Sequence, residues 1–180
     1  MAAFLPLARN LRTDLTGSLL FLQLEDGLLG ARMDEETTDL IRGERYFELD
    51  SAKDVRPGSS VALTAAKRCD IEVDFLLEGE TLTLDYAEKK LQIEITKKEG
   101  KGVAKVIFNH MTLSEMELDE EQLESRGTIR IISEADMLEI YMNNRYYMPA
   151  RIGVKLGEEQ ISIESDAATI YRAEAYCLKT

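Results

Sequence analysis

The sequence predicts an all-β protein, a two-sheet antiparallel β-sandwich of the concanavalin-like or jelly-roll type, with one short helix near its start. From residue 46 onward, short runs alternate apolar and polar residues at period two, and turn residues separate the runs. One face of each run is apolar, and a second sheet is needed to cover it. Helical patterns are scarce. Together these observations favour a sandwich over any helical or α/β fold.

Length and composition fit one folded domain with a leading segment. The chain has 180 residues, of which 44% are hydrophobic and 31% charged, as is ordinary for a globular protein. We therefore divide it into a lead-in, residues 1–45, and a sandwich domain, residues 46–180.

The lead-in contains a short apolar stretch at 4–7, a predicted strand at 19–24 and a turn signal at 25–27. A helix is predicted over 34–42. Its first turn holds three acidic residues, Arg42 lies near its end, and Gly43 is expected to stop it.

The sandwich domain contains about ten predicted strands. They span 61–64, 71–75, 81–86, 91–95, 103–108, 129–132, 138–142, 146–152, 160–164 and 169–178. A polar turn is expected at 88–90 and a single helical turn at 119–124. The carboxylates at outward positions, such as Glu72, Asp74, Glu94 and Glu139, are expected on a solvated face.

Charge and cysteine usage narrow the function class. A net charge of −12 repels phosphate backbones and anionic membrane surfaces, so neither nucleic acid nor a membrane is an expected partner. The apolar run Leu19–Leu22 is too short to span a bilayer, and no leader pattern precedes it.

Cys69 and Cys177 have no metal or redox spacing, so we expect two free, buried thiols and a cytoplasmic rather than secreted protein. A single disulfide is the alternative.

Catalytic and ligand-binding patterns are missing. No pair among the 34 acidic residues can be nominated as catalytic, and the single histidine, His110, has no recognisable partners. No metal-ligand spacing is present. Gly100 to Gly102 reads as a hairpin turn and not as a phosphate-binding loop. No cofactor is therefore expected.

One aromatic cluster is a candidate contact site. Tyr141, Tyr146 and Tyr147 could stack on sugar rings or meet a docked domain, because tyrosine combines an apolar ring with a hydroxyl. Packing within the protein is the competing interpretation, and alternation along 138–142 favours it for most of the cluster.

The stretch from Thr128 to Thr180 resembles the end of glycoside hydrolase family 32, which includes invertases, sucrose-6-phosphate hydrolases, levanases and inulinases. The run DMLEIYMNNR at 136–145, followed by YYMPARI at 146–152, is similar to that family's Val-Glu-Ile-Phe-Val-Asn hairpin and following Arg-Ile. The closing run 161–170 and the lead-in runs 5–11, 24–29 and 39–44 are also similar. Residues 12–23 look like an insertion.

The family's catalytic motifs have no counterpart here. The family carries Trp-x-Asn-Asp-Pro-x-Gly, Arg-Asp-Pro and Glu-Cys segments on an N-terminal five-bladed propeller. This chain has no tryptophan, none of its three prolines follows Asp, and neither cysteine follows Glu. No catalytic residue is carried over, and no activity is expected for the chain alone, although the parent protein would be a glycosidase of the β-fructofuranosidase type.

The resemblance implies a non-catalytic module that packs against a catalytic propeller, in cis or in trans, steadies it and aids oligomer contacts. Its docking surface is expected to be apolar and drawn from the lead-in and one sheet edge. Two alternatives remain open: a free-standing carbohydrate-binding module that contacts fructan or sucrose, and an assembly protein with no sugar ligand.

Overall fold

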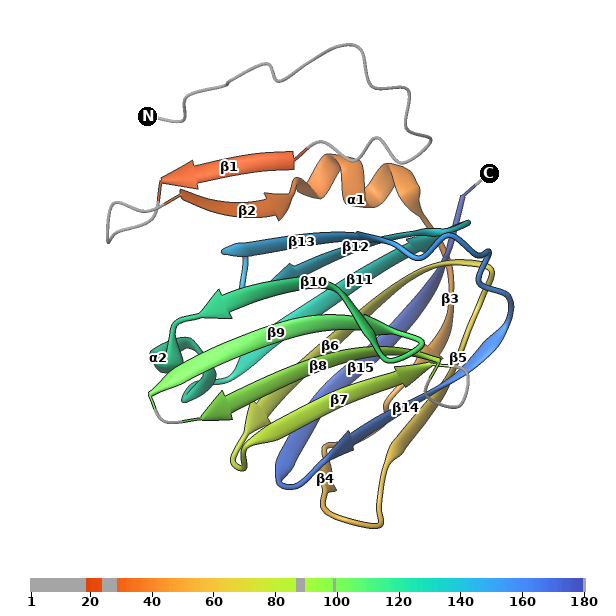
Figure 1. Cartoon of the computed structure of the whole chain (residues 1–180). Helices are drawn as coiled ribbons and strands as arrows, with labels where there is room; N and C mark the ends of the chain where they lie inside the picture. Colours follow the sequence, from red (N-terminus) through yellow and green to blue (C-terminus); the bar gives the residue numbers. More distant parts are fainter. Residues whose placement is uncertain (1–18, 24–28, 87–89, 99, 180) are drawn as a thin grey trace.

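The computed structural model describes residues 19–23, 29–86, 90–98 and 100–179. It confirms the all-β prediction: two antiparallel sheets, of six and seven strands, pack face to face, and a hairpin with a short helix lies along one side (Figure 1). Within these residues, neither of the two helices, of seven and four residues, has the length that a bilayer crossing requires.

The six-stranded sheet has the order β10-β9-β8-β7-β14-β5. Its strands are β5 (Val61–Ala65), β7 (Thr81–Tyr86), β8 (Leu91–Lys98), β9 (Lys101–Phe108), β10 (Met111–Leu118) and β14 (Glu159–Ser165).

The seven-stranded sheet has the order β13-β12-β11-β6-β15-β3, with a further short strand, β4, beside β15. Its strands are β3 (Arg42–Glu48), β4 (Lys53–Val55), β6 (Arg68–Leu77), β11 (Gly127–Glu134), β12 (Met137–Met142), β13 (Tyr146–Arg151) and β15 (Ala168–Leu178). Strand β15 joins distant parts of the chain, because it pairs with β3, β4 and β6.

The lead-in forms the hairpin of β1 (Leu19–Gln23) and β2 (Leu29–Met33), followed by α1 (Glu35–Ile41). Asp34 caps α1 by accepting a hydrogen bond from the Thr37 amide at 2.9 Å. The predicted helix therefore exists, but Gly43 does not stop it. The helix gives way to β3 at Arg42, and Gly43 lies within β3, where a Cβ atom would come within 2.9 Å of the Cys177 carbonyl oxygen.

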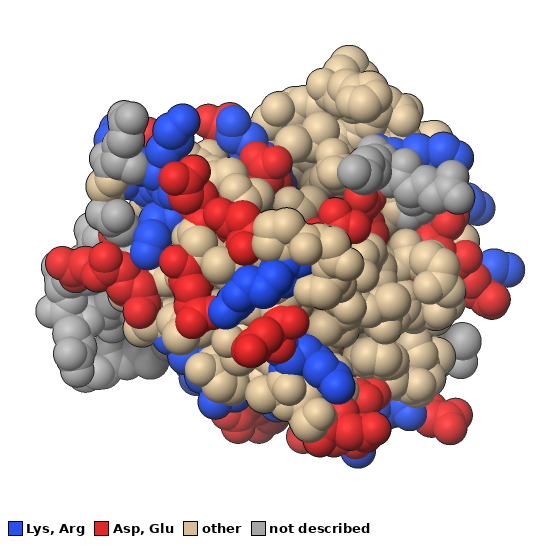
Figure 2. Space-filling model, turned by 90° about the horizontal axis from the view of Figure 1, so that it is seen from below, with Lys and Arg blue, Asp and Glu red and all other residues tan. Residues whose placement is uncertain are grey.

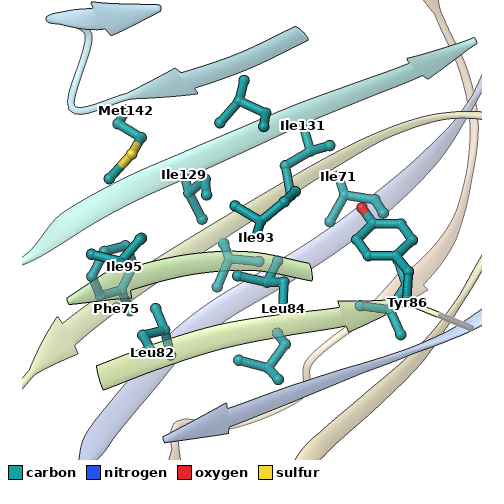
Figure 3. Packing of buried hydrophobic residues seen from close by; sticks show 14 of the residues in the cluster. Ile71, Phe75, Leu82, Leu84, Tyr86, Ile93, Ile95, Ile129, Ile131 and Met142 are labelled. Carbon is teal, nitrogen blue, oxygen red and sulfur yellow. The ribbon is translucent and has the colours of Figure 1, made fainter. Parts of the chain in front are cut away.

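The core lies between the two sheets and is built from the inward positions of alternating strands. Strand β8 shows the pattern clearly, since its apolar residues are buried and its polar residues are half-buried or exposed. Figure 3 shows side chains from both sheets interdigitating, including Ile71, Phe75, Leu82, Leu84, Tyr86, Ile93, Ile95, Ile129, Ile131 and Met142. Full burial of each such aliphatic side chain contributes about 1.5–3 kcal/mol.

All ten predicted sandwich strands are found, with 81–86 matching at both ends. The short helix α2 (Glu120–Leu123) lies within the predicted turn at 119–124. Strands β2, β3, β4 and β10 were not predicted. Strand β4 has only three residues, and in β10 a register shift between Thr112 and Ser114 breaks the alternation.

Several predicted features fall outside the described residues. These are the apolar stretch at 4–7, the lead-in motif at 5–11, the turns at 25–27 and 88–89, and most of the proposed insertion at 12–23. The division into a lead-in, 1–45, and a sandwich, 46–180, stays a prediction.

Candidate functional site

The outer face of the seven-stranded sheet carries the densest set of functional groups in the described chain. Strand pairing sets opposite charges beside one another there: Arg130 on β11 lies opposite Glu72 on β6, and Asp74 on β6 lies opposite Arg172 on β15. We call the resulting set the outer ladder, and it consists of Arg42, Arg45, Asp70, Glu72, Asp74, Arg126, Arg130, Arg172 and Glu174.

Asp70 is the centre of the outer ladder and is fully buried. Arg42 Nε approaches its Oδ2 at 2.7 Å, and Arg130 Nη2 approaches the same oxygen at 2.6 Å. Arg130 Nε also donates to Oδ1 at 2.9 Å. Two guanidinium groups therefore compensate one buried carboxylate, as a buried charge requires.

The outer ladder also fastens the lead-in to the sheet. Arg42 follows directly after α1 and reaches Glu72 at 2.6 Å as well as Asp70. Arg130 Nη1 donates to the Thr38 hydroxyl of α1 at 2.8 Å. Burial lowers the pKa of Arg42, but its hydrogen bonds and ion pairs with Asp70 and Glu72 outweigh that effect and hold the pKa above its usual value.

A second part of the outer ladder runs toward the other end of β6. Arg172 pairs with Glu72 and Asp74, and Arg126 Nη2 reaches Asp74 Oδ2 at 3.0 Å. The guanidinium of Arg126 also lies over the Tyr171 ring, 4.6 Å from its centroid. Because its carboxylates are held by guanidinium groups, the outer ladder is suited to holding elements together and poorly suited to proton transfer.

These contacts correct one sequence-based expectation. Glu72, Asp74, Glu94 and Glu139 were expected on a solvated face, but Asp74 and Glu139 are buried and the other two are half-buried. Arginines from neighbouring strands cover Glu72 and Asp74. Glu139 instead accepts a hydrogen bond from Tyr141, and Glu94 lies on β8 of the other sheet, opposite Lys105. The mixed charges extend elsewhere: on the face seen from below in Figure 1, acidic and basic side chains lie interspersed (Figure 2).

Next to the outer ladder, the lead-in covers a small apolar cluster. Met33 of β2 and Ile41 of α1 pack against Ile132, Tyr141, Tyr147 and Leu178 of the sheet. The Ala31 amide donates to the Arg145 carbonyl at 3.0 Å, which fixes β2 beside the turn after β12. The lead-in is thus bound to the sheet by apolar packing and by ion pairs.

Two of the three predicted contact tyrosines meet on this face. The rings of Tyr141 and Tyr147 lie 5.1 Å apart, tilted by 39°. The Tyr141 hydroxyl donates to Glu139 Oε2 at 2.9 Å. Tyr146 points elsewhere, since its hydroxyl pairs with Asp119 near α2. Tyr141 is buried, so its ring is not available for stacking with a sugar in this arrangement. A role for the three residues in sugar or domain contact stays a prediction.

Glu139 is a buried carboxylate held by the two tyrosines. Burial raises its pKa, while hydrogen bonds from Tyr141 and Tyr147 and the charge of Arg130 act in the opposite direction. Burial, together with the Glu139 charge, raises the pKa of Tyr147 to about 12. The group therefore keeps both phenols protonated at neutral pH and able to donate hydrogen bonds.

A small polar cavity of about 130 Å³ lies between β2 and the sheet. Its lining comprises Arg32, Met33, Glu72, Thr128, Arg130, Tyr141, Asn143 and Asn144. Two larger hollows, of about 540 and 580 Å³, lie at the loops beside β7 and β14 and at the α2 end of β9 and β10.

The remaining sequence candidates are dispersed. His110 is exposed and occupies, with Asn109, a hairpin turn at positive φ between β9 and β10. In the described part of the chain, no three His, Cys, Asp or Glu side chains converge as metal ligands. Cys69 is buried as expected, but Cys177 is only half-buried, and both are free thiols.

Sequence reasoning missed the arginines of the outer ladder. The alternation of Asp70, Glu72 and Asp74 placed three acids on one face of β6, and this is the signal that could have prompted a search for cationic partners. The partners come from β3, β11, β15 and the residue just before β11, so they could be identified only once strand pairing was known.

Comparison with solved structures shows the same fold in larger proteins. Fructan 1-exohydrolase IIa from Cichorium intybus matches with a TM-score of 0.69 and 14% identity over 90% of this chain and 40% of its own. A glycoside hydrolase family 32 protein from Bifidobacterium adolescentis matches with a TM-score of 0.63 and 13% identity, over 89% of this chain and 25% of its own. The chain therefore spans at most two fifths of either protein.

A smaller protein has a related architecture. The galectin LEC-6 from Caenorhabditis elegans matches with a TM-score of 0.51 and 14% identity, over 69% of this chain and 95% of its own. No family model and no curated protein sequence matches the chain. These likenesses show a shared sandwich fold.

Proposed function

We propose that this chain is a non-catalytic β-sandwich module of a glycoside hydrolase that cleaves fructans or sucrose, and that it binds and stabilises the catalytic propeller domain. The observation that carries the proposal is the fold likeness over about nine tenths of this chain to only 25–40% of two glycoside hydrolase chains. The short motifs at 136–152 that resemble family 32 support the same assignment.

The chemistry of the chain is consistent with a binding role. Glycoside hydrolysis needs one carboxyl group free to give a proton and a second free to attack or to activate water. The carboxylates of the outer ladder are held by arginines, and Glu139 is buried and accepts a hydrogen bond from Tyr141. None of the three family motifs occurs in the sequence.

The sequence predicted a docking surface drawn from the lead-in and one sheet edge. Because Met33 and Ile41 of the lead-in pack against the seven-stranded sheet, we expect the docking surface instead at the edge strand β10, at the end of the sandwich where β10 begins. Met111 there is 61% exposed, and Val154, in the loop leading into β14, is 49% exposed. Met111 follows Phe108, which pairs with Leu91, and Val154 precedes Ile161, which pairs with Tyr86. These two pairings lie at the same end of the six-stranded sheet, so Met111 and Val154 lie at that end too. Apolar side chains gathered at one end are suited to contact with another domain.

Activity of the chain itself is the first measurement. The purified chain, incubated with sucrose, sucrose 6-phosphate and levan, is expected to release no fructose. Release that persists through successive purification steps, and that follows the chain through a sizing column, would contradict the proposal.

Partner capture is the second measurement. The tagged chain is expected to capture, from cells that produce it, a protein that releases fructose from sucrose or fructan. The double variant Met111→Glu with Val154→Glu should abolish capture, whereas Tyr171→Glu, at an exposed aromatic residue of β15, should not. Captured material without fructoside-hydrolysing activity, or capture unaffected by the double variant, would refute the proposed role or surface respectively.

A further inference from the structure

The two cysteines lie directly opposite each other in neighbouring strands. Cys69 of β6 is the register partner of Cys177 of β15 in the antiparallel pair. Directly opposed residues have Cβ atoms about 4.5–5.5 Å apart, and a disulfide needs about 3.5–4.5 Å, with Cα atoms 4.4–6.8 Å apart. The separation between the two strands is therefore close to what a cross-link requires.

Both side chains lie on the same face of the sheet. Cys69 alternates with Ile71 and Val73, and Cys177 alternates with Ala173 and Ala175, all of which belong to the core between the sheets. A third residue places the thiols together, because the Tyr46 hydroxyl interacts with both of them. The same hydroxyl accepts a hydrogen bond from the Ala66 amide at 3.1 Å, which fixes it beside the pair.

The two thiols differ in their access to solvent. Cys69 is 0% exposed, whereas Cys177 is half-buried near the C-terminal end of β15. Burial raises the pKa of the Cys69 thiol to about 11, so it contributes little thiolate at neutral pH. An oxidant would therefore react first with Cys177, and Cys69 would act second from within the core.

We infer that Cys69 and Cys177 form a reversible cross-strand disulfide when the chain meets a low-molecular-weight disulfide such as oxidised glutathione. The Cys177 thiolate attacks one glutathione sulfur, forms a mixed disulfide and releases one glutathione thiolate. Cys69 then loses its proton, attacks the Cys177 sulfur and releases the second glutathione. Two protein thiols are oxidised, one glutathione disulfide is reduced to two thiols, and the two thiol protons pass to the solvent or to the departing thiolates.

The cross-link would stabilise the fold by constraining the unfolded chain. It closes a loop of roughly 100 residues and ties the end of β15 to the start of β6, next to the junction of α1 and β3. For a chain of this length, the expected effect is a rise in Tm of about 10 °C.

The experiment uses the full chain, reduced with dithiothreitol or equilibrated with oxidised glutathione. We expect two titratable thiols in denaturant after reduction, none after oxidation, a monomer lighter by two hydrogen atoms, and a proteolytic peptide joining Cys69 to Cys177. The oxidised form should melt about 10 °C higher, and dithiothreitol should reverse this shift.

The variant Cys177→Ser is the matched control. It should retain one thiol after the same treatment and show no oxidation-dependent change in Tm. Three results in the wild-type chain would overturn the inference: stable glutathione attached at Cys177 without ring closure, dimers linked through Cys177, or two thiols that persist after oxidation. Because these readouts are made on the wild-type protein, they hold even if the variant folds poorly.

Discussion

At the scale of single residues, Asp70 is the anion that two arginines of the outer ladder share. Its carboxylate is fully buried and receives Arg42 and Arg130 together. Replacing it with asparagine removes the anion that the two half-buried guanidinium groups share, and leaves Arg42 with Glu72 as its remaining carboxylate partner. Because breaking one side of a buried ion pair typically costs 3–5 kcal/mol, we expect Asp70→Asn to lower the free energy of unfolding by about 3–5 kcal/mol in urea titrations.

The control for this change is Glu164→Gln, at an exposed carboxylate on the outer face of the six-stranded sheet. Its effect should stay within about 0.5 kcal/mol. If Asp70→Asn cost no more than the control, the outer ladder would have no part in holding the lead-in to the sheet.

Glu139 makes a pH-dependent contribution to stability. Its folded pKa is raised above the ordinary value of 4.5, so its contribution to stability is fully present below that pH and is lost as the pH rises through the folded pKa. Glu139→Gln keeps an acceptor for the Tyr141 hydroxyl and removes the charge. The variant should gain stability over the wild type at pH 7, and the gain should shrink as the pH falls toward 4.5.

Unfolding free energies of both proteins between pH 4 and 8 test this prediction, since the other titrating groups cancel in the difference. A difference that does not change with pH would show that Glu139 titrates normally in the fold.

At the scale of elements, α2 depends on a glycine in the neighbouring strand. A Cβ atom at Gly102 of β9 would come within 2.6 Å of Leu123 Cδ1 and 2.9 Å of Leu118 Cβ. We expect Gly102→Ala to displace α2 and to lower the free energy of unfolding by about 1–3 kcal/mol, as overpacking does.

Gly157 offers the comparison for Gly102. A Cβ atom there would meet only Glu159 Oε1, at an ordinary 3.6 Å. Thermal unfolding of Gly157→Ala should therefore give a Tm unchanged or slightly raised. Equal effects of the two substitutions on stability would mean that α2 moves aside for the Gly102→Ala side chain with no loss of stability.

The elements also show how far sequence reasoning reaches. Alternation located the ten predicted strands, because each has one face toward the core, and it failed for β10, where a bulge interrupts the period. It also led to the expectation of a solvated outer face. Burial of Asp74 depends on Arg126 and Arg172, which are distant in sequence, so no local pattern contains that information.

At the scale of the whole molecule, the topology should make folding slow. Strand β15 pairs with β6, far earlier in the chain, and with β3 and β4 at its beginning. Such distant pairings require long loops to close, and the entropy cost of closing them slows folding. We expect refolding from urea in milliseconds to seconds, followed by stopped-flow tyrosine fluorescence because the chain has no tryptophan. Complete refolding within microseconds would contradict this view.

The outer ladder has a consequence for how this protein can diverge. Arg42 and Arg130 share Asp70, Arg42 also pairs with Glu72, and Arg172 links Glu72 to Asp74. Most of these charges therefore have more than one partner. A single charge-changing substitution leaves a neighbouring charge without one of its partners. Only coordinated substitutions at several of these positions keep the charges on the face balanced. Among homologues, these positions should therefore drift as a group, with intermediate sequences rare, while the exposed positions of the other sheet change one at a time.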